Sequence, residues 1–134
     1  MSTSDLLAAA SRARSRAHAP YSGFAVGAAL LTRNGKVFAG CNVENVSLGL
    51  TMCAERAAIA AAVVDGEKDF VAIGIVADSR EPIVPCGACR QVLAEFNPMI
   101  NVITSTLQRQ VQEFNLSELL PRPMQGISEA FSDV

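Results

Sequence analysis

The chain has 134 residues and a mass of 14.1 kDa, the size of one domain, and a domain of this length buries roughly two-thirds of the surface that its unfolded chain exposes. Half of the residues are hydrophobic and only 18% are charged, which excludes a disordered chain and hints at a subunit interface. The net charge of -2 and the pI near 5.3 argue against a dedicated nucleic-acid binder, which usually carries a basic excess. We expect a single domain over residues 1–134 whose partner is a small molecule or a protein.

The sequence predicts neither a membrane span nor a secretory signal. The longest apolar run, AAIAAAVV at residues 57–64, is far shorter than the ~20 residues that a spanning helix needs. The first sixteen residues place no basic segment ahead of their few apolar residues. We therefore expect a soluble cytoplasmic protein, in which the four cysteines are thiols or metal ligands rather than disulfides.

The first part of the chain predicts a helix and then a hairpin. Ser2 to Asp5 can cap a helix whose apolar residues recur at helical spacing up to Ala17 and which stops before Pro20. Two strand-like segments, residues 24–32 and 36–44, flank the dipeptide Asn34-Gly35, which is typical of a tight hairpin turn. We expect these two segments to pair in antiparallel fashion.

The rest of the chain alternates helices and strands. The strand at residues 70–78 is apolar on both faces, which predicts a central position in a sheet that is covered on two sides. Pro85 favours the start of the helix that follows it, and Asn97-Pro98 ends that helix. The predicted elements are helices at 53–66 and 86–96, strands at 70–78, 100–106 and 111–115, and a last turn at 117–121. Together they indicate an α/β fold, with a sheet of mixed direction and helices on its faces.

The cysteines form a pattern that is typical of a metal site. Cys86 and Cys89 are three residues apart in the first turn of a helix, so both sulfurs point the same way, and Cys53 begins another helix. Three thiolates select zinc over magnesium or calcium, and three protein ligands leave a fourth position for water. An open position is typical of a catalytic zinc site.

Two other interpretations fit the cysteines alone. A CxxC pair is more often a structural zinc site or a redox pair than part of a hydrolytic site. A fourth ligand, such as Cys41 or His18, would close the zinc shell and leave the ion without catalytic function. Cys41 otherwise reads as a core residue, because free cysteines are among the most buried residue types.

Glu55 and Arg56 favour the catalytic interpretation. A carboxylate two residues after Cys53 can take a proton from a metal-activated water and pass it on, although an acid in a first helical turn is often only a partner of the helix dipole. Three thiolates on Zn²⁺ carry a net negative charge, and Arg56 could offset it through a hydrogen bond to a sulfur. On position alone, Arg56 could equally face solvent.

The segments CAE at residues 53–55 and PCGACRQ at residues 85–91 resemble those of the small cytidine deaminases, zinc hydrolases that convert cytidine to uridine. The segments APYSGFAVGAALLT, NGKVFAGCNVEN and NLSELLP are also similar to that family, so the resemblance covers about residues 18 to 121. It implies a three-layer α/β/α fold with a mixed five-stranded sheet, a Zn²⁺ cofactor, a pyrimidine nucleoside as substrate and a homotetramer.

The resemblance also implies a role for each matching residue. Cys53, Cys86 and Cys89 would hold the zinc, Glu55 would move the proton, and Arg56 would bind the ligand sulfurs. The implied substrate contacts are Phe24 against the pyrimidine ring, Asn42 and Glu44 at the ribose hydroxyls, and the backbone N–H of Ala54 and C=O of Val84 at the base. Asn42 and Glu44 are two residues apart, and alternate residues of an extended strand share a face. A polar strand end that meets solvent would show the same pattern.

Two positions depart from the family pattern. Leu48 and Met124 stand where many small members carry aromatic residues, at positions that the family associates with substrate pockets at subunit contacts. Flexible side chains there would replace flat, rigid walls. We hypothesise a pocket that admits bulkier cytidines, for example with a substituent on the exocyclic nitrogen.

Three other functions compete with deamination of free cytidine or deoxycytidine. The related blasticidin S deaminases share the zinc and the glutamate, but the segment CNVEN at residues 41–45 favours a ribose ligand. A deaminase of polynucleotide bases would need a basic cluster, which this sequence lacks. A structural zinc module that binds a protein partner would leave Glu55, Asn42 and Glu44 without a role.

Overall fold

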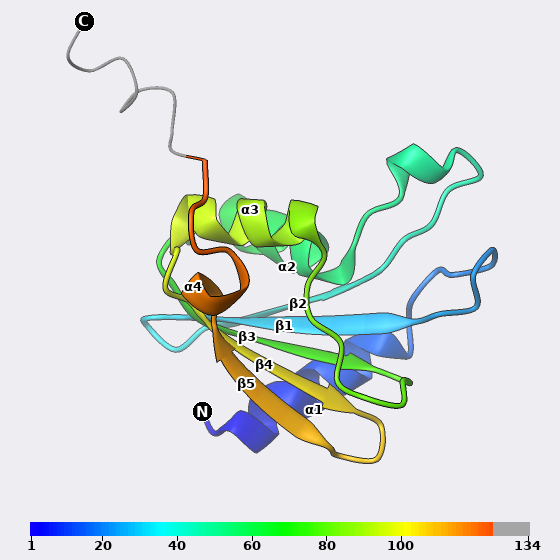
Figure 1. The fold of residues 1–134 in the computed structure, drawn as a ribbon, viewed down its shortest axis with the longest axis horizontal. Coiled ribbons are helices and arrows are strands. Elements are labelled where there is room, and N and C mark those ends of the chain that lie inside the picture. Colours follow the sequence, from blue (N-terminus) through cyan, green and yellow to red (C-terminus); the bar gives the residue numbers. More distant parts are fainter. Residues whose placement is uncertain (125–134) are drawn as a thin grey trace, which may run out of the picture.

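The computed structural model describes residues 1–124, which form a mixed sheet between two layers of helices (Figure 1). The elements in chain order are α1 (Thr3–Arg14), β1 (Val26–Thr32), β2 (Val37–Cys41), the 3-10 helix η1 (Leu48–Leu50), α2 (Ala54–Val64), β3 (Phe70–Ala77), α3 (Gly87–Phe96), β4 (Asn101–Thr106), β5 (Val111–Asn115) and α4 (Leu116–Leu119). No helix within residues 1–124 is both long and apolar enough to cross a membrane. The predicted α/β/α fold with a mixed five-stranded sheet is confirmed.

The sheet has the strand order β2-β1-β3-β4-β5. Three of its four pairings are antiparallel, and β3 and β4 alone are parallel. The parallel pair needs a crossover, which α3 supplies between the two strands. β3 is the middle strand, and its last six residues are all buried, as its continuous apolar sequence predicts.

The two faces of the sheet carry separate cores, because side chains alternate along each strand. One core lies beneath α1 and includes Leu6, Ala29 and Ile103. The other lies beneath α2 and α3 and includes Phe70 and Leu93. Figure 1 shows α1 on one face and α2 with α3 on the other. The second core therefore fixes both helices whose first residues carry the predicted site.

Two glycines allow α2 and α1 to pack directly on the strands. A Cβ at Gly40 in β2 would lie 2.4 Å from the Ala54 carbonyl oxygen and 2.4 Å from the Ala58 nitrogen of α2. A Cβ at Gly27 in β1 would lie 1.9 Å from the Ala10 carbonyl oxygen of α1. Real Cβ atoms do not approach backbone this closely, so both helix positions depend on the missing side chains.

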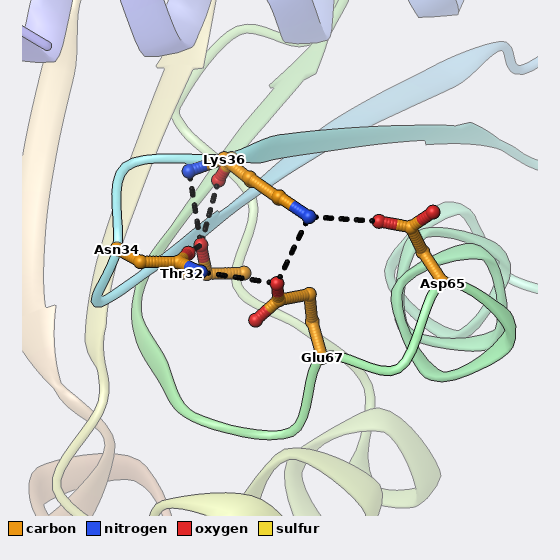
Figure 2. Close-up of polar contacts among 5 residues, drawn as sticks. All are labelled: Thr32, Asn34, Lys36, Asp65 and Glu67. Carbon is orange, nitrogen blue, oxygen red and sulfur yellow. Dashed lines mark hydrogen bonds and ion pairs between the residues drawn. The ribbon is translucent and has the colours of Figure 1, made fainter.

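The predicted hairpin forms at Asn34-Gly35, where Gly35 has a φ of +89°. Polar contacts tie this turn to the C-terminal end of α2 (Figure 2). The Lys36 ammonium lies 3.3 Å from Asp65 and 3.2 Å from Glu67, and the Asn34 amide donates to Glu67 at 3.1 Å. The Lys36 backbone N–H donates to the buried Thr32 hydroxyl at 2.9 Å. These contacts fix the end of α2 that is farthest from Cys53.

Two predicted boundaries differ from the structure by three residues. The second strand was expected to run to residue 44 but ends at Cys41, because Val43 pairs with His18 and Met52 instead of continuing along β1. The first helix begins with the expected capping box at Ser2 and Asp5, but it ends at Arg14, three residues before Ala17. As a result the segments around residues 18 and 43 lie side by side beyond the sheet.

Candidate metal centre

Three of the four cysteines lie at the N-terminal ends of α2 and α3. Cys53 is the N-cap residue of α2, Cys86 is the N-cap residue of α3, and Cys89 is in the first turn of α3. Pro85 comes just before α3, where a fixed φ and a missing N–H are tolerated. The Cys86 sulfur accepts a hydrogen bond from the Cys89 backbone N–H at 3.4 Å, as an N-cap side chain does. Both helix starts therefore direct sulfur atoms to one place.

The spacing of these sulfurs fits a soft metal ion. The three sulfur atoms lie within 4.8 Å of one another, and those of Cys53 and Cys86 are 3.9 Å apart. Two sulfurs at about 2.3 Å from a tetrahedral zinc ion would be separated by about 3.8 Å. Within residues 1–124 this is the one group of three or more potential ligands, so neither Cys41 nor His18 joins it. The donor set thus fits zinc and leaves a ligand position for water.

Arg56 supplies positive charge to the sulfurs. Its Nη2 atom donates to the Cys53 sulfur at 3.3 Å, while its buried Nε atom has no hydrogen-bond partner among the described residues. Hydrogen bonds to Cys53 and then Cys89 raise the pKa of Arg56 above its ordinary value. The guanidinium therefore faces the sulfurs and not the solvent. A partly buried cation beside the thiols of Cys53 and Cys89 favours their deprotonated form, which is the form that binds a metal.

The two cysteines of the CxxC pair differ in their electrostatic environment. Burial acts to raise the pKa of the Cys86 thiol, but hydrogen bonds, led by the one from the Cys89 backbone, outweigh burial and lower it. Burial and then the charge of Glu55 raise the pKa of Cys89, whose side chain is fully buried. A cation bound between the sulfurs would offset this cost, because metal ligation deprotonates a thiol.

Glu55 is buried next to Cys89, one of the three clustered cysteines. It is the second residue of α2, and only 5% of its surface is exposed. Burial raises its pKa, and this effect is opposed by its own backbone N–H, by Cys89 and by Arg56. The burial of Glu55 argues against a role limited to the helix dipole, because an acid with that role alone is usually exposed to solvent. A raised pKa makes a carboxylate a better proton acceptor, which suits a general base.

Asn42 fixes the backbone that leads into β1. Its Oδ1 atom accepts a hydrogen bond from the Val26 N–H at 2.8 Å, and its Nδ2 atom donates to the Phe24 carbonyl at 2.8 Å. The side chain is almost fully buried. Each amide atom still has one unused hydrogen-bonding position, because the amide offers two donors and two acceptor lone pairs. Asn42 can therefore bind a hydroxyl group of a ligand and keep the hydrogen bond that positions Phe24.

Glu44 holds the turn at residues 21–22. One carboxylate oxygen accepts from the backbone N–H groups of Tyr21 and Ser22, at 3.0 and 3.1 Å. The other oxygen accepts from the Ser22 hydroxyl at 2.5 Å. These hydrogen bonds, led by that of the Ser22 hydroxyl, lower the pKa of Glu44. The carboxylate is thus ionised at neutral pH and can accept further hydroxyl donors.

The remaining predicted residues lie in different environments. Ala54 is fully buried at the start of α2, and Val84 is half-buried in the segment before α3. Phe24 is 38% exposed, whereas Leu48 and Met124 are more than two-thirds exposed. Cys41 was predicted to be a core residue, which is wrong, because it is only partly buried at the end of the edge strand β2.

Three residues with hydrogen bonds around the site were not predicted from the sequence. Ser22 binds Glu44, and Arg90 and Gln91 bind backbone groups more than 25 residues further along the chain. Arg90 and Gln91 directly follow the second cysteine of the CxxC pair, but no local pattern in the sequence indicates their distant partners.

Comparisons with known proteins agree with this geometry. The family model described as "Cytidine and deoxycytidylate deaminase zinc-binding region" matches residues 1–106. A protein named cytidine deaminase from Halalkalibacterium halodurans is 52% identical over 117 residues, which cover 87% of this chain and 89% of that protein. The crystal structure of cytidine deaminase from Burkholderia pseudomallei superposes with a TM-score of 0.90 at 47% identity, covering 92% of this chain and all of that one. A blasticidin-S deaminase from Bacillus cereus is 31% identical over 104 residues, which cover 72% of this chain and 74% of that protein.

Proposed function

The chain belongs to the family of cytidine and deoxycytidylate deaminases, and we propose that it hydrolyses cytidine and deoxycytidine to uridine and deoxyuridine with release of ammonia. Support comes from the names of its relatives at high identity and from the grouping of three cysteines with a buried glutamate. The reaction adds one water molecule across C4 of the pyrimidine and breaks the bond to the exocyclic nitrogen.

The metal in this proposal is Zn²⁺, held by Cys53, Cys86 and Cys89. A zinc ion bound there supplies Lewis acidity, which lowers the pKa of a water molecule toward neutrality. Arg56 balances the charge of the three thiolates through its bond to the Cys53 sulfur. The partial positive charges at the N-terminal ends of α2 and α3 act in the same sense.

Glu55 carries the proton in this proposal. Its carboxylate takes a proton from the attacking water and delivers it to N3 of the pyrimidine, which makes C4 more electrophilic. The same carboxylate then takes the second proton and gives it to the departing amine, so that ammonia leaves. Burial suits this role because it raises the pKa of Glu55, so that the carboxyl group both accepts and gives up a proton easily.

The substrate contacts divide between the base and the sugar. Phe24 lies against the pyrimidine ring, while the Ala54 N–H and the Val84 carbonyl bind its polar edge. Glu44 accepts from a ribose hydroxyl with its ionised carboxylate, and Asn42 uses the remaining donor position of Nδ2 or the remaining acceptor position of Oδ1. The hydrogen bonds of Asn42 to Phe24 and Val26 support a second function for this residue, which is to place the ring of Phe24.

The burial of Glu55 next to Cys89, one of the three clustered cysteines, is the observation on which this function rests. The test measures zinc content and the rate of uridine formation from cytidine for the native protein and for Glu55→Gln. We expect the variant to retain its zinc and to lose at least ~10²-fold in kcat, because general acid–base catalysis contributes about 10²–10⁴-fold. A variant that keeps its turnover, or a native protein without zinc, would refute the proposal.

The pocket in this proposal admits cytidines with a substituent on N4. Leu48 and Met124 support it, because both are flexible side chains at positions where many relatives carry aromatic rings. The test compares the native protein with a Leu48→Tyr, Met124→Phe double variant on cytidine and N4-methylcytidine. The native protein should show the higher kcat/KM ratio of N4-methylcytidine to cytidine. An equal or lower ratio would dispose of this part of the proposal.

We also propose that four copies of this chain assemble in the cytoplasm, each folded as a single domain. Support comes from the apolar composition and from apolar side chains that are more than two-thirds exposed around η1, namely Val46, Leu48 and Leu50. Patches of this kind on a soluble protein mark contact surfaces.

A further inference from the structure

Arg90 links two backbone segments that meet at α3. Its Nε atom donates to the Pro85 carbonyl at 2.7 Å, and its Nη1 atom donates to the Leu119 carbonyl at 3.0 Å. Pro85 precedes the ligand Cys86, whereas Leu119 is the last residue of α4. One partly buried guanidinium therefore joins the start of the metal-binding helix to the C-terminal part of the chain.

The segment that leads to Cys86 has few other polar supports. Residues 80–86 belong to no helix or strand, so no regular backbone ladder holds them. The Thr104 hydroxyl of β4 donates to the Ile83 carbonyl at 2.5 Å, and the next carbonyl with a side-chain donor is that of Pro85. Cys86 itself is exposed. The position of its sulfur thus depends on how firmly the Pro85 carbonyl is held, in addition to the hydrogen bond that the sulfur accepts from the Cys89 N–H.

Gln91, the next residue on α3, makes a separate contact with the C-terminal segment. Its amide donates to the Met124 carbonyl at 3.2 Å and accepts from the Met124 N–H at 3.1 Å. This pair involves neither Pro85 nor Leu119. Gln91 therefore offers a matched control, because its loss would release Met124 and leave both bonds of Arg90 in place.

We propose that Arg90 is a positioning residue of the metal centre, which fixes Cys86 through the Pro85 carbonyl and is itself held by the Leu119 carbonyl. This inference rests on the proposed zinc site. A guanidinium presents its donors in a fixed planar fork, so one side chain can bind two carbonyls at once. Removing a partner that orients a metal ligand typically weakens metal binding by about 10–100-fold.

The test measures the zinc affinity of the full chain by competition with a chromogenic chelator, together with its Tm. We expect zinc binding by Arg90→Gln to be at least ~10-fold weaker than in the native protein. Arg90→Lys keeps the positive charge but cannot place donors on both carbonyls, so its loss should be smaller. This conservative variant also provides a measurement if Arg90→Gln does not fold.

Two controls separate a role at the metal from a general loss of stability. Asn97→Ala removes a hydrogen bond of 2.8 Å to the Phe70 carbonyl at the other end of α3, so it should lower Tm without changing zinc affinity. Gln91→Leu should also leave zinc affinity unchanged. Native affinity in both Arg90 variants, or an equal loss in either control, would overturn the role of Arg90. A native chain that binds no zinc would overturn the proposed function as well.

Discussion

Glu44 is the one titratable side chain among the proposed substrate contacts, and the fold lowers its pKa. Its carboxylate receives three hydrogen bonds from the turn at Tyr21 and Ser22, which joins the segments around residues 18 and 43. These bonds favour the ionised form, so the pKa of Glu44 is lower in the folded protein than its ordinary value of 4.5. The stabilisation that they provide is therefore present above pH 4.5 and is lost as the pH falls through the folded pKa.

The lowered pKa of Glu44 predicts how the stability of the metal-free protein changes with pH. The difference in Tm between the native chain and Glu44→Gln should be constant from neutral pH down to about pH 4.5, the ordinary value, and should shrink in more acidic buffer. Differential scanning calorimetry across this range measures it. A gap that stays constant below pH 4, or widens there, would show that the carboxylate charge does not hold the turn.

At the level of elements, the position of α2 depends on its contact with β2. Ala54 and Ala58 of α2 lie where a side chain on Gly40 would have to be, and the same helix begins with Cys53 and Glu55. Any displacement of α2 would therefore move a candidate metal ligand and the proposed acid together. Gly27 has the same relation to α1, but α1 lies on the opposite face of the sheet (Figure 1).

Three alanine substitutions test this dependence. Gly40→Ala and Gly27→Ala should each destabilise the protein by about 1–3 kcal/mol, the usual cost of overpacking. Only Gly40→Ala should also lower kcat, because α2 carries residues of the proposed site and α1 carries none. Gly49→Ala is the control for packing within the chain, since no atom of the described residues lies within 4 Å of the added Cβ. Equal kcat values for the Gly27 and Gly40 variants would contradict the proposed link between helix position and chemistry.

The sequence predicts elements well where a local signal exists. Ser2 with Asp5 marks the start of α1, Asn34-Gly35 marks the hairpin, and Pro85 marks the start of α3. The end of β2 has no such signal, because Val43 leaves the sheet to pair with His18 and Met52, which are distant in sequence. Cys41 was misplaced in the core for the same reason, since a sequence does not reveal which strand lies at the edge of the sheet.

At the level of the whole molecule, the segment of residues 42–53 extends beyond the sheet, beside the loop that contains Tyr21 (Figure 1). The side chains of Val46, Leu48 and Leu50 are 77%, 71% and 70% exposed, which is unusual for three large apolar residues so close together. Contact with further copies of the chain would bury them.

Sedimentation velocity tests this assembly. The native protein should sediment as a tetramer, and Leu50→Asp should shift it toward smaller species and lower its activity. Met99→Asp is the matched control, because Met99 is also exposed (59%) but lies in the turn after α3. A native protein that remains monomeric at micromolar concentrations would contradict the proposal, as would equal effects of the two variants.

The candidate site illustrates which contacts a sequence can reveal. Cys86 and Cys89 are predictable because their spacing within one helix fixes their geometry, and Cys53 follows once a third soft ligand is required. The bonds of Arg90 to Leu119 and of Gln91 to Met124 join residues about thirty positions apart, and no local pattern encodes them. The second function of Asn42, as a support for Phe24, likewise appears only in the folded chain.

The coordination of zinc in the native protein tests the central claim most directly. X-ray absorption spectroscopy of the zinc-loaded chain should show three sulfur neighbours at about 2.3 Å and one oxygen neighbour at about 2.0 Å, as expected for three cysteines with one position open to water. Four sulfur neighbours, or a histidine nitrogen in the fourth position, would mean a closed structural site and would contradict the proposed hydrolysis.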